Sequence, residues 1–295
     1  MLRTQKDSAT IILKIRHIIK IKGEDFMIKV NGEKLKITKF PNGESLIKNE
    51  GILKDVGIFE DTVEMTVKFE NDEDLLHMMF IKKHLDEMNL DTILKIPYLP
   101  YSRMDRTEGE NIFTLKYICS LINSLNFKKV IVYEPHSDVS VALIDRCEVV
   151  NSTLELLKVV TKKLNLNTED YVFFPDKGAE KRYSKHVKGF NLLTGIKERD
   201  FSTGYIKKLD IVGEKPGKDF RVVILDDLCS RGGTFILSAN KLKELGAKEI
   251  YLVVTHCEDT IFDGNILDTD LINKVYTTNS ILSRQHEKIS VEEII

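Results

Sequence analysis

The stretch RVVILDDLCSRGGT, residues 221–234, decides the fold of this chain. Its run of apolar and β-branched residues at 222–225 predicts a buried strand of the kind that parallel sheets contain. A short loop follows the strand, and apolar residues then recur at helical spacing over residues 235–245. A strand, a loop and a helix in this order are the repeating unit of α/β folds.

The loop between that strand and that helix carries the chemistry. Asp226 and Asp227 stand at the carboxyl end of the strand, where open α/β sheets bind their ligands. Gly232 and Gly233 let backbone N–H groups approach an anion closely, and a helix that opens at Thr234 adds positive potential. Carboxylates suit the hydroxyl groups of a sugar, and backbone amides suit its phosphate. The loop therefore predicts a site for a phosphorylated sugar.

An apolar strand that ends in two aspartates also occurs as the metal-holding strand of nucleotide hydrolases. That class needs a phosphate loop of the form G-x-x-x-x-G-K-[ST] as well. The nearest candidate, residues 213–219, has the wrong spacing and no hydroxyl after its lysine. The motif search therefore favours the phosphorylated sugar.

Length and composition indicate an ordinary globular protein of two domains. A chain of 295 residues is long for a single core. With 44 basic and 46 acidic residues, no net field attracts nucleic acid or an anionic membrane. The four cysteines lack tight spacing, which favours reduced thiols, and neither a membrane span nor a signal-peptide pattern is present in the sequence. We expect a cytoplasmic enzyme.

Strands and helices alternate along the chain. Helical spacing predicts helices over residues 74–88, 112–125 and 154–164, in addition to 235–245. Apolar runs predict strands over residues 92–97, 129–133, 171–175, 189–193, 205–212 and 249–255, and residues 9–39 predict strands with a hairpin turn at Asn31-Gly32. This alternation predicts parallel sheets in two similar α/β domains, residues 1–150 and 151–295, with the boundary near residues 150–152.

Polar side chains follow three further predicted strands. They occupy residues 98–106, 134–138 and 176–182. Because a parallel sheet brings the carboxyl ends of its strands to one edge, we expect these segments to line ligand sites.

Six segments, taken in order, give the chain a resemblance to the ribose-phosphate pyrophosphokinases, also called PRPP synthetases. The segments are Phe40–Glu44, Ile96–Arg106, His136, Asp176–Gly178, Lys197–Arg199 and Asp226–Thr234. A single match of this kind would be weak, but six in sequence make chance improbable.

The resemblance implies two similar domains, each a mainly parallel sheet flanked by helices, as in the type I phosphoribosyltransferases. It places ATP-binding segments in the first domain and a diphosphate loop, a mobile catalytic loop and a ribose-phosphate loop in the second. The implied ATP-binding residues are Phe40, Asn42, Glu44, Arg103, Met104, Asp105 and Glu108. Asp176, Lys177 and Gly178 are implied for the diphosphate, and Asp226, Asp227, Ser230, Arg231, Gly232, Gly233 and Thr234 for the ribose phosphate.

The reaction implied by the resemblance is a diphosphoryl transfer. The anomeric hydroxyl of a ribose 5-phosphate moiety attacks the β-phosphorus of ATP, and AMP leaves. Lys197 and Arg199 would close over the transferring group, with His136 as a third catalytic residue. Mg²⁺ at His136 and Asp176 would bridge phosphate oxygens. The resemblance also implies a homo-oligomer, a dimer or a hexamer, that binds ATP and a ribose phosphate and neither nucleic acid nor membrane.

Departures from the family pattern leave the acceptor open. Arg231 stands where the family has a hydroxyl, and a guanidinium can bind a second phosphate. The acceptor is then either ribose 5-phosphate or the ribose 5-phosphate end of ADP-ribose, as in an ADP-ribose pyrophosphokinase of NAD salvage. Met104 and Glu108 also replace a glutamine and an aspartate of the family pattern.

Two alternatives belong to other classes. Some relatives of PRPP synthetases are non-catalytic regulatory partners whose ligand loops have decayed, but here the catalytic and acidic positions persist. A type I phosphoribosyltransferase shares the acidic pair of the sugar loop. It would not account for the segment around Arg103 or for a second α/β half.

Overall fold

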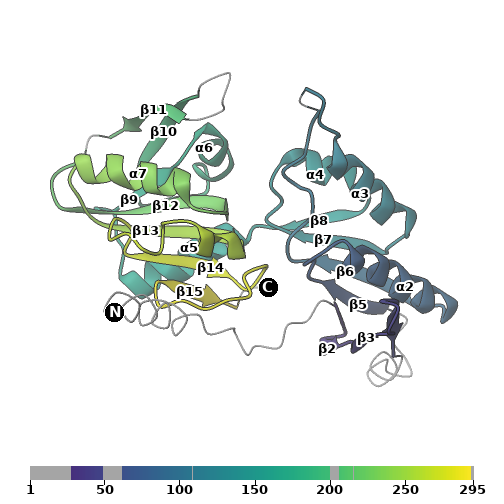
Figure 1. Ribbon diagram of the computed structural model, residues 1–295. Helices are drawn as coiled ribbons and strands as arrows, with labels where there is room; N and C mark the ends of the chain where they lie inside the picture. Colours follow the sequence, from purple (N-terminus) through teal and green to yellow (C-terminus); the bar gives the residue numbers. More distant parts are fainter. Residues whose placement is uncertain (1–27, 49–61, 108, 200–205, 215, 294–295) are drawn as a thin grey trace, which may run out of the picture. The chain divides into compact units, whose positions relative to one another are not determined.

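The computed structural model describes residues 28–48, 62–107, 109–199, 206–214 and 216–293. These residues form two compact units, residues 28–151 and residues 152–293 (Figure 1). Each unit contains its own mainly parallel sheet, its own helices and its own hydrophobic core. The expected α/β fold class is confirmed.

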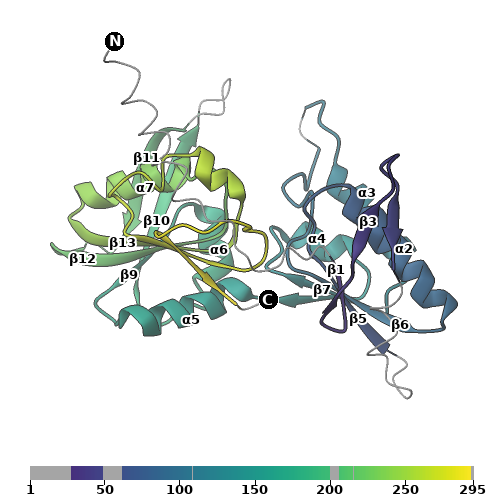
Figure 2. The same cartoon turned by 60° about the horizontal axis from the view of Figure 1, so that its bottom comes forward.

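The sheet of the first unit has the strand order β2-β1-β5-β6-β7-β8. Its strands are β1 (Ile28–Val30), β2 (Glu33–Lys34), β5 (Thr62–Val67), β6 (Asp91–Ile96), β7 (Lys129–Tyr133) and β8 (Cys147–Val150). Strands β5 to β8 are parallel, and they are connected by α2 (Glu73–Glu87), α3 (Thr114–Ser124) and α4 (Asp138–Leu143). A separate antiparallel pair, β3 (Ile37–Lys39) and β4 (Ser45–Ile47), completes the unit (Figure 2).

One face of this first sheet is buried, and the residue pattern explains which. Along β5, Val63, Met65 and Val67 are fully buried, whereas the residues between them are partly or fully exposed. The buried positions pack against Met78 and Ile81 of α2. This period of two is what a half-buried strand requires.

The sheet of the second unit has the strand order β11-β10-β9-β12-β13-β14-β15. Its strands are β9 (Tyr171–Phe174), β10 (Asn191–Arg199), β11 (Ile206–Gly213), β12 (Phe220–Cys229), β13 (Ala247–Cys257), β14 (Lys274–Thr278) and β15 (Ile289–Glu292). The helices are α5 (Ser152–Leu164), α6 (Lys177–Tyr183) and α7 (Gly233–Glu244), with a 3₁₀ turn η2 (Asp259–Asp263). All neighbouring strands are parallel except β10 and β11.

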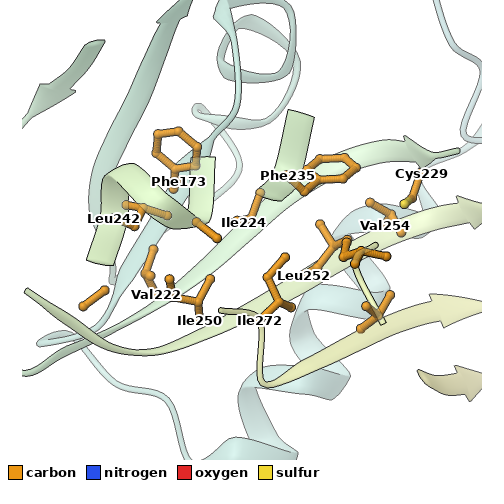
Figure 3. Packing of buried hydrophobic residues seen from close by; sticks show 14 of the residues in the cluster. Phe173, Val222, Ile224, Cys229, Phe235, Leu242, Ile250, Leu252, Val254 and Ile272 are labelled. Atoms are coloured by element: carbon orange, nitrogen blue, oxygen red, sulfur yellow. The ribbon is translucent and has the colours of Figure 1, made fainter. Parts of the chain in front are cut away.

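Both faces of the second sheet are covered at its centre. Val222 and Ile224 of β12 share one core cluster with Phe235 and Leu242 of α7 (Figure 3). Val223 and Leu225 lie in the core on the opposite face, with side chains of α5 and α6. Because both sets of alternate residues are buried, β12 reads as a continuous apolar run rather than an alternating one.

Most predicted elements are confirmed, but some strands are longer than their apolar runs suggested, among them β10 and β12. β12 pairs with β13 from Phe220 to Cys229, so Asp226 and Asp227 lie inside the strand and not beyond it. β10 runs to Arg199 because the antiparallel partner β11 extends it. Backbone pairing, which needs no apolar side chain, sets the length of both strands.

Short elements escaped the sequence pattern. Strands β4, β8, β14 and β15 and helices α4 and α6 were not expected, because a few residues carry too little periodicity. Strand β5 was also missed, although its six residues alternate clearly. The hairpin turn at Asn31 and Gly32 is confirmed, and both residues have positive φ, although β2 covers Glu33–Lys34 rather than residues 35–37. Residues 9–27 of the predicted N-terminal strands lie outside the described residues. Among the helices of the described residues, none has the length and apolar character that crossing a bilayer requires.

Arg221, at the start of β12, fixes this strand to the preceding segments. Its Nε and Nη2 donate to the two oxygens of Asp170 at 2.8 and 2.6 Å, and it also donates to the carbonyls of Leu164 and Asn165 at 3.0 Å each. Asp170 is 4% exposed. One guanidinium therefore joins β12, the loop before β9 and the end of α5.

We predict that Arg221→Leu lowers the free energy of unfolding by about 3 kcal/mol, because it leaves a buried carboxylate without its cation. Urea titration followed by circular dichroism measures the change. The matched control is Lys158→Ala, which breaks an exposed pair with Glu155 and should change stability by less than about 0.5 kcal/mol. Equal effects of the two variants would contradict the structural role of Arg221.

Candidate active site

Three acidic side chains gather at the carboxyl ends of β9 and β12. Asp176 follows β9, while Asp226 and Asp227 lie near the end of β12. Burial, together with the negative charges of Asp227 and Asp176, raises the pKa of Asp226 well above its ordinary value. The carboxylates predicted for the diphosphate loop and for the sugar loop thus belong to one electrostatic cluster.

Arg182 of α6 balances Asp227. Its Nη1 lies 3.0 Å from Oδ2 of Asp227, whose side chain is 7% exposed. Burial opposes the charge of the guanidinium, but Tyr183 and Asp227 outweigh it and raise the pKa of Arg182. This ion pair fixes the direction of the Asp227 carboxylate.

Lys197 of β10 balances Asp176. Its Nζ donates to Asp176 Oδ2 at 2.9 Å, and only 8% of the lysine side chain is exposed. Asp176 Oδ1 accepts from the backbone amides of Gly178 and Ala179 at 3.0 and 3.1 Å, and so caps α6. Burial favours the neutral acid, but Lys197 and these amides outweigh it and lower the pKa of Asp176. The carboxylate is therefore ionised at neutral pH.

The position of Lys197 differs from the expectation of a mobile loop. Lys197 and Arg199 both lie in strand β10, which β11 pairs along its length. The side chain of Arg199 lies outside what the structure describes. Of this predicted catalytic pair, the lysine is held by a strand and by its contact with Asp176.

The loop from residue 229 to residue 233 is held by the segment around η2. Ser230 Oγ lies 2.9 Å from Thr260 Oγ1, and Gly232 adopts φ +78° where it caps α7. A Cβ at Gly264 would lie 2.0 Å from the carbonyl oxygen of Arg231, so only glycine allows this approach. The Arg231 side chain is exposed.

Other predicted residues of this unit are in more open positions. Lys177 is 63% exposed and donates to Glu180 Oε2 at 2.6 Å. Gly233 is exposed and Thr234 is half-buried at the first turn of α7. None of these three predicted residues is acidic, so none adds a carboxylate to the cluster of Asp176, Asp226 and Asp227.

The predicted ATP-binding residues lie in the first unit on two segments. Phe40, Asn42 and Glu44 belong to the tight turn between β3 and β4, which Gly43 closes with φ +91°. All three are exposed, and 49% of Phe40 is accessible. The turn thus presents an aromatic ring and polar groups to a ligand.

The second segment, residues 98–106, follows β6. Arg103 is exposed and Met104 is half-buried, whereas Asp105 is buried and accepts from Arg106 Nε at 3.0 Å. Glu108 lies outside the described residues. Of the described predicted residues here, Arg103 is the most open to a ligand.

His136 is half-buried between β7 and α4, in the first unit, whereas Asp176 belongs to the second. In the described part of the chain, no group of three histidine, cysteine or acidic side chains is arranged to hold a metal. The metal role expected for His136 and Asp176 therefore stays a prediction.

Comparison with known proteins identifies the family. The chain is 30% identical to a ribose-phosphate pyrophosphokinase from Sulfurisphaera tokodaii over 86% of this chain and 87% of that protein. It is also 30% identical to one from Pyrococcus abyssi over 88% of each chain. The chain belongs to the ribose-phosphate pyrophosphokinase family.

Two further comparisons agree with this membership. The family model described as phosphoribosyl synthetase-associated domain matches residues 202–294. The crystal structure of phosphoribosylpyrophosphate synthetase from Mycobacterium smegmatis aligns with a TM-score of 0.68 at 16% identity, over 88% of this chain and 86% of that one. The expected family is thus confirmed, and the structural likeness supports the fold.

Sequence patterns gave no role to two residues that shape the site. Arg182 stands in the polar segment after β9, and only its contact with Asp227 distinguishes it from a surface charge. Gly195 lets β10 pass close to β9, because a Cβ there would lie 2.6 Å from the carbonyl oxygen of Pro175. A glycine inside a strand is a signal for such an approach.

We predict that Gly264→Ala weakens binding of a phosphorylated sugar by roughly 10-fold or more, because the new methyl group must displace the loop at Arg231. Isothermal titration with ribose 5-phosphate measures the change. Gly217→Ala is the matched control, since a Cβ there meets nothing within 4 Å. Native affinity in a folded Gly264→Ala protein would show that the loop does not hold the sugar.

Proposed function

We propose that the chain transfers the β,γ-diphosphate of ATP to the anomeric hydroxyl of ribose 5-phosphate and releases AMP. Membership of the ribose-phosphate pyrophosphokinase family makes it a diphosphotransferase. The single observation that supports the assignment most is the contact of Lys197 with Asp176, within the cluster that also contains Asp226 and Asp227. Through this contact, a lysine lies beside the carboxylate predicted to bind the diphosphate, which is close to the two carboxylates predicted to bind the ribose.

The residues divide the work of the transfer. The carboxylates of Asp226 and Asp227 accept hydrogen bonds from the ribose hydroxyls, and the loop before α7 receives the 5-phosphate. The anomeric oxygen then forms a bond to the β-phosphorus and its proton passes to water, while the bond from that phosphorus to the AMP oxygen breaks and AMP leaves with the electron pair. Negative charge spreads over the phosphoryl oxygens, so the ammonium of Lys197 stabilises the transition state.

Mg²⁺ is the cofactor that we propose. Asp176 is ionised, as a ligand of a hard cation must be, and it lies near the carboxyl groups of Asp226 and Asp227. These oxygens fit the ligand preference of magnesium. When bound, the ion supplies neutralising charge for the diphosphate. Asp176 is our proposed ligand in the second unit, and His136 stays the predicted ligand from the first.

The exposed Arg231 gives the second acceptor a physical basis. Its guanidinium stands in the sugar loop and can fork to the second phosphate of ADP-ribose, which ribose 5-phosphate does not possess. The named relatives are ribose-phosphate pyrophosphokinases, which favours the simpler acceptor. We therefore propose ribose 5-phosphate first.

The test is to incubate the protein with ATP, Mg²⁺ and each acceptor, alone and in competition, and to identify the products by mass. We expect AMP only when an acceptor and Mg²⁺ are present, and more product from ribose 5-phosphate than from ADP-ribose. A preference for ADP-ribose would change the acceptor but keep the reaction. No acceptor-dependent AMP with either would favour the non-catalytic regulatory partner.

We predict that Lys197→Met lowers turnover by roughly 10²-fold while ATP binding changes little, because a contact made in the transition state appears in the rate. Methionine keeps the apolar stem of this nearly buried side chain. Steady-state kinetics and ATP titration give the two quantities.

The matched control is Lys208→Met on the neighbouring strand β11, where the lysine pairs with Asp210 at the surface. It should keep wild-type turnover. A weaker ATP affinity with unchanged turnover in Lys197→Met would assign this lysine to ground-state binding.

A further inference from the structure

The start of α2 holds both sides of the turn between β3 and β4. Lys39, just before the turn, donates to Glu73 at 2.8 Å and 2.5 Å. Ser45, just after the turn, has its Oγ 2.7 Å from Nε2 of His77. The exposed turn residues 40–44 are therefore flanked on both sides by residues that contact the same helix, α2 (Figure 2).

The same helix start contacts the second predicted ATP segment. Tyr101 has φ +61° and its hydroxyl donates to a carboxylate oxygen of Asp72. This bond raises the pKa of the Tyr101 hydroxyl, because the carboxylate opposes a phenolate. Residues 98–106 and the β3–β4 turn are thus attached to adjacent positions at one helix end.

Local hydrogen bonds make this helix end a rigid support. Asn71 Oδ1 accepts from the amide of Glu73 at 2.9 Å. In return, Asp74 Oδ2 accepts from the amides of Asn71 and Glu70 at 3.0 and 2.8 Å. Together these bonds satisfy backbone amides at the start of α2 and just before it. Asp74 is fully buried.

His77 differs from the other contacts of the turn because it is buried. It is 2% exposed, and its Nδ1 faces Oδ1 of Asp74 at 3.6 Å. The Lys39–Glu73 pair is half exposed on both sides, so solvent screens it and it holds the turn weakly. Of the two described side-chain contacts that flank the turn, the one between His77 and Ser45 is therefore less screened by solvent and holds the turn more firmly.

We propose that His77 is a positioning residue for ATP binding. Its buried ring holds Ser45 through Nε2 and so sets where the β3–β4 turn presents Phe40. The inference rests on the proposed function, in which this turn contacts ATP. His77 acts only through Ser45 and does not touch the nucleotide.

The test compares steady-state kinetics of Ser45→Ala, His77→Leu and His77→Gln. Ser45→Ala and His77→Leu remove the hydrogen bond and should raise KM for ATP by about 3- to 10-fold. The value of kcat and the KM for ribose 5-phosphate should change by less than about 2-fold, because the acceptor loop lies in the other unit. His77→Gln places an amide near the position of Nε2 and should restore most of the ATP affinity.

Ser124→Ala in α3 is the matched control, since it removes a serine hydroxyl that donates to Leu121 O in the same unit. It should leave KM for ATP unchanged. If His77→Leu does not fold, Ser45→Ala still tests the proposal, because Ser45 is only half-buried.

Phe40→Ala distinguishes the ATP-binding role of the turn from the positioning role of His77. A raised KM for ATP in Phe40→Ala, with wild-type values in Ser45→Ala and His77→Leu, overturns the positioning role and leaves the proposed function intact. An unchanged KM for ATP in Phe40→Ala overturns the ATP role of the turn and the positioning role with it. Equal losses for both substrates in the His77 variants, without rescue by Gln, would show a general structural role and also overturn the proposal.

Discussion

The crowding of carboxylates at the end of β12 is the constraint around which the second unit is arranged. Asp227 and Asp176 are each held by a cation from another element, Arg182 of α6 and Lys197 of β10. The strand order puts β9 between β10 and β12, so these elements reach one edge of the sheet. Burial, together with the negative charges of Asp227 and Asp176, raises the pKa of Asp226. At this edge of the sheet, the carboxylates of Asp227 and Asp176 are therefore held in position, and three acidic side chains lie close together.

For the sugar phosphate of the proposed function, this concentration of carboxylates favours one orientation of the ligand. A free phosphate is repelled by the acidic cluster, so hydroxyl groups or a bound cation are the favoured neighbours of Asp226. The phosphate is then left to the loop before α7, where Gly232 turns the backbone and the helix adds positive potential. Gly264 lets this loop lie against the segment after η2. Charge and backbone geometry thus separate the two ends of the ligand.

The sequence predicted those parts of the fold that depend on local patterns. The apolar run at 222–225 and the helical spacing after it identified β12 and α7, because both faces of the strand and one face of the helix are buried. Sequence could not show that Arg182 faces Asp227 or that Lys197 lies in a strand, because those facts depend on partners distant in the chain. The role of His77 was hidden for the same reason, since its partner Ser45 is 32 residues away. The family resemblance supplied positions, but not the contacts that hold them.

Burial distinguishes the polar contacts that hold a side chain in one position from surface contacts that solvent screens. In the second unit, Lys177 pairs with Glu180 in solvent, while Lys197, almost fully covered, pairs with Asp176. A screened pair contributes little, and its two long side chains exchange partners freely. The ammonium of Lys197 is nearly buried although Asp176 is partly exposed, so this lysine cannot lose its partner without leaving a desolvated charge. The nearly buried Lys197, rather than the exposed Lys177, is therefore the cation on which the proposed transfer site depends.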